Sequence, residues 1–199
     1  MLISEIRDDL CLAYANTLSW RGSAAATEKL HALPDLLGWL ETDAHVASPA
    51  LQDVKGWSRE HPKKADAMFG DAIQLREAMF RIFEALATGA AVRDPDFATL
   101  KAALTEAPAR RQLVRADGRY AWRLETLRPS APNLLTPVLW SAGDLMLNAA
   151  RRRIRQCANE KCLWLFLDES KSGTRRWCDM TSCGNRAKAQ RHYSKIKQG

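Results

Sequence analysis

Apolar side chains recur at three- and four-residue steps over most of the first 150 residues, and this spacing predicts a mainly helical region. The first run, which includes Ile3, Leu10 and Leu18, predicts an amphipathic helix that ends before Ser19. Similar runs predict further helices over residues 30–40, 49–57, 62–89 and 94–104, and a last one from residue 136 through the arginines at 151–153 to Arg155.

Proline and glycine mark the boundaries of these predicted helices. Pro62 suits the first turn of a helix, and Gly89 suits the position after the last turn. Asp94-Pro95 and Thr136-Pro137 open two later helices in the same way, while Pro34 starts, bends or breaks the second one.

The pattern changes to that of a β-hairpin between residues 111 and 125. Segments 111–116 and 119–125 flank Asp117-Gly118, and the tight turn between such strands needs positive φ angles that Asp and Gly tolerate. Tyr120, Trp122 and Leu124 are predicted to share the buried face. The fold class is therefore mainly α with small β-hairpins.

Length and composition allow one core of ordinary size with a small satellite domain. The chain has 199 residues, of which 46% are apolar and 27% charged, and this excludes collagen-like, low-complexity and strongly disordered classes. The longest apolar runs, such as residues 163–167, are far shorter than the roughly 20 residues that cross a bilayer. Charged residues interrupt the first 18 positions, so no signal peptide is predicted and we expect a cytoplasmic location without membrane attachment.

Positive charge is concentrated in the last quarter of the chain. The formal net charge is +7, but residues 151–199 carry +9 and residues 1–150 carry −2. This asymmetry predicts a basic module, residues 151–199, that contacts an anionic partner, and a near-neutral helical domain, residues 1–150, with another role in sensing or dimerisation.

Four of the five cysteines form two equal pairs in the basic module. Cys157 and Cys162 are followed, after fifteen intervening residues, by Cys178 and Cys183. Such pairs on two local turns suit one tetrahedral Zn²⁺, and four thiolates leave no open position for catalysis. Disulfides are disfavoured in a reducing cytoplasm, and Fe–S clusters usually place three cysteines close together. The pattern therefore favours one structural zinc ion.

The segment between the two cysteine pairs is predicted to form a small hairpin around the metal. Residues 163–167 form an apolar strand, 168–173 a polar turn, and 174–177 the return to the metal. Trp164, Phe166 and Trp177 would pack around the ion.

A helix is predicted after the last cysteine, with a basic stripe along one face. Because the zinc site would hold this helix in place, its basic face is expected to bind DNA phosphates in a salt-dependent way. The predicted DNA-binding residues are Arg175, Arg176, Arg186, Lys188, Arg191, His192 and Lys195.

No catalytic constellation is evident in the chain. It lacks a P-loop, a dinucleotide fingerprint, a nucleophile elbow and an H-E-x-x-H motif, so an enzyme is the least supported class. His31, His45 and His61 are scattered among predicted loops and helix ends. Cys11 lies on the apolar side of the first predicted helix, where we expect it to be a small buried side chain.

The motif from Cys178 through Gly184-Asn185-Arg186, together with Cys157 and Cys162, resembles the CGNR zinc-finger family. The segment Ala15-Asn16-Thr17-Leu18 with Trp20-Arg21 is similar to the start of the ABATE domain, which precedes this finger in bacterial proteins described as stress-induced transcription regulators. The resemblance implies zinc held by the four cysteines and a DNA-binding role.

Two further hypotheses stay open beside a zinc-containing, DNA-binding regulator. In one, the helical domain senses a small-molecule effector in a pocket of Asn16, Arg21 and nearby tryptophans, although the same two residues could equally cap helix ends. In the other, the basic module binds RNA or an acidic protein. The helical domain is also a candidate for homodimer formation.

Overall fold

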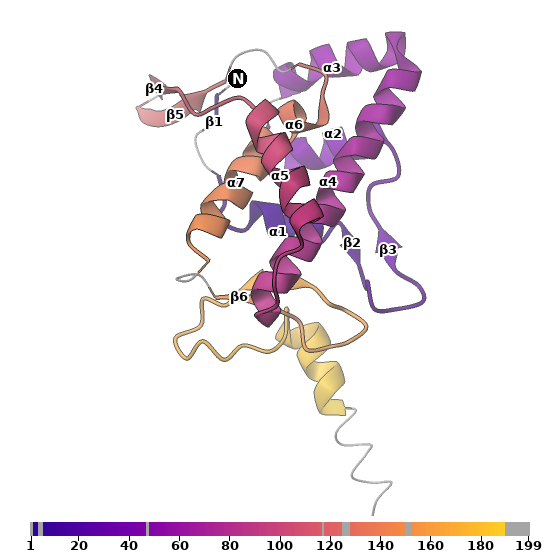
Figure 1. Ribbon diagram of the computed structural model, residues 1–199, viewed down its shortest axis with the longest axis vertical. Coiled ribbons are helices and arrows are strands. Elements are labelled where there is room, and N and C mark those ends of the chain that lie inside the picture. The colour runs from indigo at the N-terminus through magenta and orange to yellow at the C-terminus, as the bar shows by residue number, and fades with distance from the viewer. Residues whose placement is uncertain are drawn as a thin grey trace, which may run out of the picture.

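The computed structural model describes residues 2–3, 6–46, 48–116, 118–124, 128–149 and 153–189. Its first part is a helical body (Figure 1), and its last part is a small hairpin followed by a short helical segment. The helices of the body are α1 (Leu10–Ala15), α2 (Leu33–Thr42), α3 (Ser48–Glu60), α4 (Pro62–Thr88), α5 (Asp94–Glu106), α6 (Ala131–Leu134) and α7 (Thr136–Leu147). The mainly helical class with small hairpins is confirmed.

Helix α4 is the centre of the body and has the boundaries that the sequence predicts. Pro62 lies in its first turn, and Gly89 follows its last turn with a φ of 77°, a left-handed conformation that glycine adopts without strain. Met79, Ile82 and Phe83 on α4 are almost fully buried. Because α1, α2, α3, α5 and α6 all contact α4, the main core is built around it.

The N-terminal segment is not one helix from Ile3 to Leu18, so that prediction is wrong. Residues Leu2–Ile3 form strand β1, and α1 covers Leu10–Ala15 alone. Ile3 belongs to a buried cluster with Leu124 and Trp140, whereas Leu10 enters the main core. The apolar spacing across this segment therefore comes from a strand and a helix that pack in different places.

The predicted β-hairpin forms the tip of a three-stranded sheet. Strands β4 (Gln112–Ala116) and β5 (Arg119–Arg123) pair antiparallel, and β1 pairs with the other edge of β5. The predicted buried face is only partly correct, because the tip projects from the body (Figure 1). Leu124 at the base is buried and Trp122 is half-buried, but Tyr120 near the turn is 62% exposed.

The last helix of the body is shorter than predicted. Helix α7 ends at Leu147, and strand β6 (Ile154–Gln156) occupies positions that we expected to be helical up to Arg155. Residues 150–152 lie outside the described part of the chain. Ile154 is buried in the main core, so the chain extends here to place this side chain and to pair with β7 (Leu165–Leu167).

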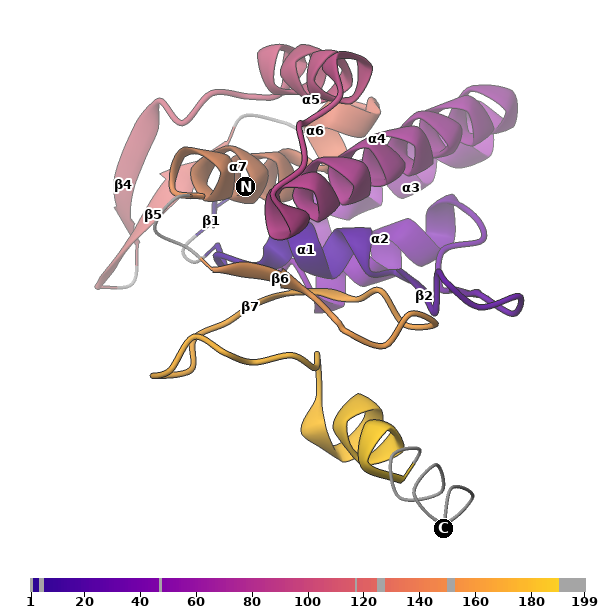
Figure 2. The same ribbon diagram turned by 60° about the horizontal axis from the view of Figure 1, so that its bottom comes forward.

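The β6–β7 hairpin packs against the body, beneath α1 and α4 (Figure 2). Ile154 and Leu165 on its inner face are members of the main apolar core. Two shorter strands, β2 (Leu18–Ser19) and β3 (Thr27–Glu28), form a separate ladder after α1. No helix among the described residues is both long and apolar enough to cross a membrane.

Candidate metal centre and basic surface

The first cysteine pair lies on a tight loop that follows β6. The Cys157 backbone N–H donates to the Trp164 carbonyl at 2.8 Å. The Asn159 carbonyl accepts from the N–H groups of Cys162, at 2.7 Å, and Leu163, at 3.2 Å. Leu163 has a φ of 55°, which turns the chain into β7. These bonds bring both thiols to the same side of the loop.

The second cysteine pair lies on a short π-helical turn, η1 (Met180–Gly184), that leads into a helical segment at 185–189. The Asp179 carboxylate accepts hydrogen bonds from the backbone N–H and the hydroxyl of Thr181, at 2.9 and 2.7 Å. The Gly184 N–H donates to the Asp179 carbonyl at 3.0 Å. Asp179 therefore fixes the turn that carries Cys178 and Cys183.

The four sulfur atoms form a compact cluster. All lie within 4.8 Å of one another, and the Sγ atoms of Cys162 and Cys183 lie 3.7 and 3.8 Å from that of Cys178. Ligands about 2.3 Å from a tetrahedral zinc ion are about 3.8 Å apart, so these distances fit the edges of a zinc tetrahedron. Cys157, Cys162 and Cys183 are buried and Cys178 is half-buried. The donor set and its spacing suit one thiolate-bound metal ion.

Electrostatics also favours a cation at this cluster. A hydrogen bond from Cys162 lowers the pKa of the Cys157 thiol to about 2, and the same hydrogen bond, which needs the Cys162 proton, raises the pKa of Cys162 to about 12. Hydrogen bonds with Cys157 and Cys162, together with burial and the charge of these neighbours, raise the pKa of Cys178. Several thiolates can share this small volume only when a bound cation offsets their mutual repulsion.

Aromatic side chains enclose the cluster as the sequence predicts, with one addition from the body. Phe166, Trp164 and Trp177 pack against the cysteines, and so does Trp20. Trp20 follows β2 and has a φ of 55°. Its contact with the finger depends on how two segments about 140 residues apart are folded, which no local sequence pattern reveals.

Asn159 also takes part in the site, although it was not among the predicted site residues. Its amide Nδ2 lies 3.5 Å from the Cys183 sulfur, and its Oδ1 accepts from the Lys161 N–H at 3.1 Å. An N–H donor stabilises a metal-bound thiolate and orients it. An Asn two residues after the first cysteine is a local signal that could have indicated this role.

Asn16 joins the body to the finger rather than facing a ligand pocket. Its Nδ2 donates to the Leu165 carbonyl at 2.8 Å, and its Oδ1 accepts from the Leu165 N–H at 3.1 Å. Only 3% of Asn16 is exposed. The amide thus extends the edge of β7 like a further strand, and this contact explains the residue without a ligand.

Arg21 is likewise engaged by the protein. Its guanidinium forms a two-point ion pair with Glu77, at 2.6 and 3.0 Å, and donates to the Ala15 carbonyl at 2.9 Å. It also lies over the ring of Phe80, 3.9 Å from the ring centre. The structure therefore does not assemble Asn16 and Arg21 into the predicted pocket but uses both for internal contacts.

A buried arginine extends this ion-pair network. Arg76 on α4 is 2% exposed and binds both carboxylate oxygens of Glu28 at 2.7 Å. Its Nε also donates to Glu77 at 2.9 Å. Arg76 and Arg21 thus tie the β2–β3 ladder, and the segment after β2 that contacts the finger through Trp20, to the central helix.

The predicted DNA-binding residues differ in what they contact. Arg175 holds the loop before Cys178, because its side chain donates to the carbonyls of Trp177 and Cys178 and lies over Phe166. Arg186, on the terminal helical segment, lies over Trp20 with its Cζ 4.6 Å from the ring centre.

Two other predicted DNA-binding residues are exposed to solvent, and the remaining three lie outside the described residues. Arg176 and Lys188 are exposed and have no acidic partner among the residues that the structure describes. Arg191, His192 and Lys195 lie outside the described residues.

A helical body followed by a compact four-cysteine unit with an exposed basic surface defines a protein of the zinc-finger class. Residues 153–195 match the family described as "CGNR zinc finger". Residues 8–149 match the ABATE family, described as "Putative stress-induced transcription regulator". The chain therefore belongs to the ABATE family and carries a CGNR finger after it; neither description is that of an enzyme family. No curated protein matches the chain.

Proposed function

We propose that this protein is a cytoplasmic, zinc-dependent DNA-binding regulator of transcription, and not an enzyme. The observation that carries the proposal is the cluster of four sulfur atoms within 4.8 Å of one another, placed next to the basic terminal segment. In the proposal, Cys157, Cys162, Cys178 and Cys183 hold one structural Zn²⁺. The ion links the two turns and fixes the orientation of the helical segment at 185–189.

The charge distribution supports nucleic acid as the partner. The finger keeps a large positive excess even after four thiolates and one Zn²⁺ are counted, whereas the body is slightly negative. Arg176 and Lys188 are proposed to contact DNA phosphates directly, together with Arg191, His192 and Lys195. Arg175 and Arg186 are exposed, so they are proposed to contribute to the same positive surface while retaining their internal contacts.

The test is a fluorescence-polarisation titration of the zinc-loaded full chain against duplex DNA at several salt concentrations. Affinity should fall steeply with salt, and Lys188→Ala should reduce the slope of log K against log salt by about one unit. Lys101→Ala is the matched control, because Lys101 is an exposed lysine on α5 of the body. No binding, or a flat salt response, would overturn the proposal.

Competition separates DNA from the other anionic partners. RNA and polyglutamate should displace duplex DNA less effectively than unlabelled duplex does. Preferential displacement by RNA or by the acidic polymer would assign the finger to the alternative class of interaction.

The body is proposed to supply regulation, by sensing an effector or by forming a homodimer. The support for sensing is a separate cavity between α5, the β4–β5 hairpin and α6. Strand β6 follows α7 after a short connection. A shift of α6 or α7 on ligand binding would therefore be transmitted along the chain to the finger.

A further inference from the structure

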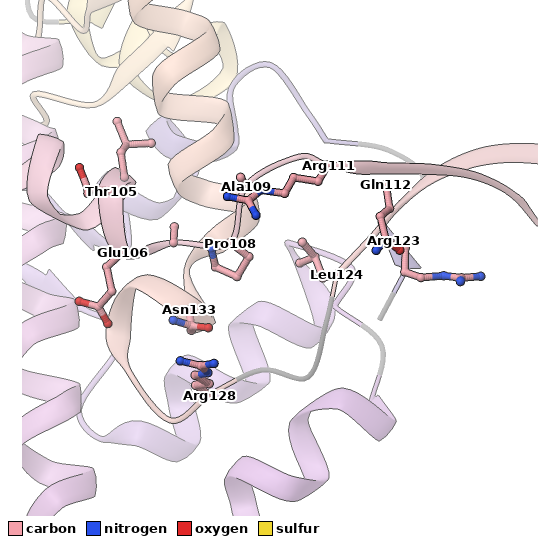
Figure 3. Close-up of a pocket in the computed structure, with 12 residues that line it drawn as sticks. Thr105, Glu106, Pro108, Ala109, Arg111, Gln112, Arg123, Leu124, Arg128 and Asn133 are labelled. Atoms are coloured by element: carbon pink, nitrogen blue, oxygen red, sulfur yellow. The ribbon is translucent and has the colours of Figure 1, made fainter.

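A cavity of about 390 Å³ lies in the body (Figure 3), and the β4–β5 hairpin and α6 beside it lie away from the terminal helical segment (Figure 1). The end of α5, the following loop, the base of the β4–β5 hairpin and the segment before α6 form its walls. This volume is within the range of pockets that bind small molecules. The cavity contains neither Asn16 nor Arg21 and is separate from the cysteine cluster.

Three arginines line this cavity: Arg111, Arg123 and Arg128. Figure 3 shows Arg111 extending toward Ala109 and Pro108, and Arg128 extending toward Asn133, while Arg123 points away from them. Among the described residues, none of the three guanidinium groups has a hydrogen bond or an ion pair. Glu106 is the acidic residue of the lining, and it forms no ion pair with them in that part of the chain.

Arg110, the neighbour of Arg111, differs from it because its guanidinium has partners within the protein. Arg110 forms an ion pair with Asp144 at 2.6 Å and lies over the Trp140 ring, 4.8 Å from its centre. The chain thus satisfies one arginine internally and leaves the next one beside a cavity. An arginine fork without an acidic partner among the described residues is suited to a carboxylate or phosphate group.

Besides the exposed Thr105 and Gln112, the rest of the lining offers one buried polar side chain and an apolar wall. Asn133 is 6% exposed, and its amide donates one hydrogen bond to the Ser130 hydroxyl at 3.1 Å, which leaves a second N–H for a ligand. Leu124 is buried, and Leu104 and Pro108 are partly buried. An anionic group beside Arg111 and Arg128 would therefore leave room for a compact apolar group against these side chains.

We propose that this cavity binds a small organic anion, a carboxylate or a phosphate monoester that carries a compact apolar group. Arg111 and Arg128 bind the charged group, and Asn133 donates a further hydrogen bond. The inference gives the proposed sensing role of the body a site and a ligand class. It does not require the finger to bind DNA.

The test is isothermal titration of the zinc-loaded full chain, at constant ionic strength, with phenyl phosphate and benzoate as probes. At least one of them should bind saturably with one site per chain, and benzyl alcohol should not bind. Arg111→Gln and Arg128→Gln should each weaken binding by about tenfold or more. Arg119→Gln is the control, because Arg119 is exposed on β5 and is not part of the lining.

Near-ultraviolet circular dichroism checks that each variant keeps the native fold, which we expect because all of these arginine side chains are exposed. If Arg111→Gln alone disturbs the fold, Arg128→Gln decides. The proposal is overturned if neither anion binds saturably, if benzyl alcohol binds equally well, or if Arg119→Gln weakens binding as much as the cavity variants do. The titration contains no DNA, so its failure is distinguishable from failure of DNA binding by the finger.

Discussion

At the scale of single residues, the contact between body and finger depends on one buried amide. Asn16 satisfies both backbone groups of Leu165, and neither partner is accessible to water. Removing the amide leaves a buried N–H and a buried C=O without partners, and each carries a desolvation cost. Asn16 therefore couples the stability of the finger hairpin to α1.

We predict that Asn16→Ala lowers the free energy of unfolding by about 2–4 kcal/mol. Urea denaturation followed by circular dichroism measures this change. Asn148→Ala is the control, because Asn148 is exposed and its side chain donates to the nearby Asp144 carbonyl at the end of α7. Equal effects of the two substitutions would contradict the role given to Asn16.

The ion pairs of Arg76 predict a dependence of stability on pH. Burial raises the pKa values of Glu28 and Glu77, but hydrogen bonds from Arg76 and Arg21 more than offset this, so both pKa values lie below their ordinary range. Carboxylates with depressed pKa values stabilise the folded state above their unfolded pKa, near 4.3, and this stability is lost as the pH falls.

We therefore expect Arg76→Met to destabilise the protein strongly at pH 7, by about 3–5 kcal/mol, because the partly buried Glu28 loses its ion-pair partner and Glu77 keeps only Arg21. The difference from the unsubstituted protein should shrink below about pH 4, as the carboxylates protonate. Urea denaturation at both pH values provides the measurement. Arg7→Met, which removes an exposed ion pair with Asp9, should have little effect at either pH. A difference that is independent of pH would count against this explanation.

Residue-scale features were predictable only where local spacing carries the information. The four cysteines form two equal pairs, and this repeat indicated the cluster directly. Asn16 and Arg21 were recognised as notable, but their partners Leu165 and Glu77 are distant in the chain. The sequence does not distinguish a polar side chain that binds a residue far along the chain from one that binds a ligand.

At the scale of elements, the finger hairpin pairs differently from what we expected. The sequence predicted a small hairpin in which residues 163–167 form a strand, 168–173 a turn and 174–177 the return to the metal. Instead, β7 pairs with β6, so that Ile154 lies opposite Leu167 and the first cysteine loop joins the two strands. Apolar content identifies a strand but not its partner, because pairing depends on which side of the strand the body covers.

A close backbone contact also sets the position of the finger. A Cβ atom at residue 22 would collide with the Glu160 carbonyl, whereas a Cβ at residue 38, in α2, would meet no atom within 4 Å. Gly22→Ala should therefore lower the melting temperature, at a cost of about 1–3 kcal/mol, because backbone must move. Gly38→Ala should raise it slightly, since alanine favours a helix. Thermal unfolding of the two matched variants checks the opposite signs, and a neutral Gly22→Ala would argue against a tight contact.

The helices of the body were the most predictable elements. Pro62 and Gly89 gave the boundaries of α4 correctly, because backbone chemistry at helix ends is local. The segment at Ile3 was mispredicted because its apolar residues serve β1 and α1 in turn. The same limitation explains Tyr120. Aromatic and apolar side chains alternate along this segment as they do in a strand, but the body does not cover Tyr120.

At the scale of the whole molecule, the metal centre and the body are expected to unfold together. Ile154 and Leu165 belong to the main core, although they flank the first cysteine loop. The charge division near residue 150 marks the change of sequence family, but the apolar core crosses it. That continuity could not be inferred from composition, because two adjoining segments with different charge can still share one core.

Zinc removal by a chelator should consequently lower the melting temperature of the body as well as unfold the finger. We expect one cooperative transition in the metal-loaded protein and a lower, broader one after chelation. Differential scanning calorimetry gives the result, with zinc added back as the control. A body transition that keeps its temperature after chelation would show that the two parts fold independently.

The most direct test of the account follows zinc content and DNA affinity in the same samples. Protein stripped of metal is reloaded with increasing zinc, and each sample is measured by metal analysis and by fluorescence polarisation on duplex DNA. DNA binding should rise in proportion to zinc and be complete at one ion per chain. DNA binding of equal strength in the metal-free protein, or none at full zinc occupancy, would contradict it.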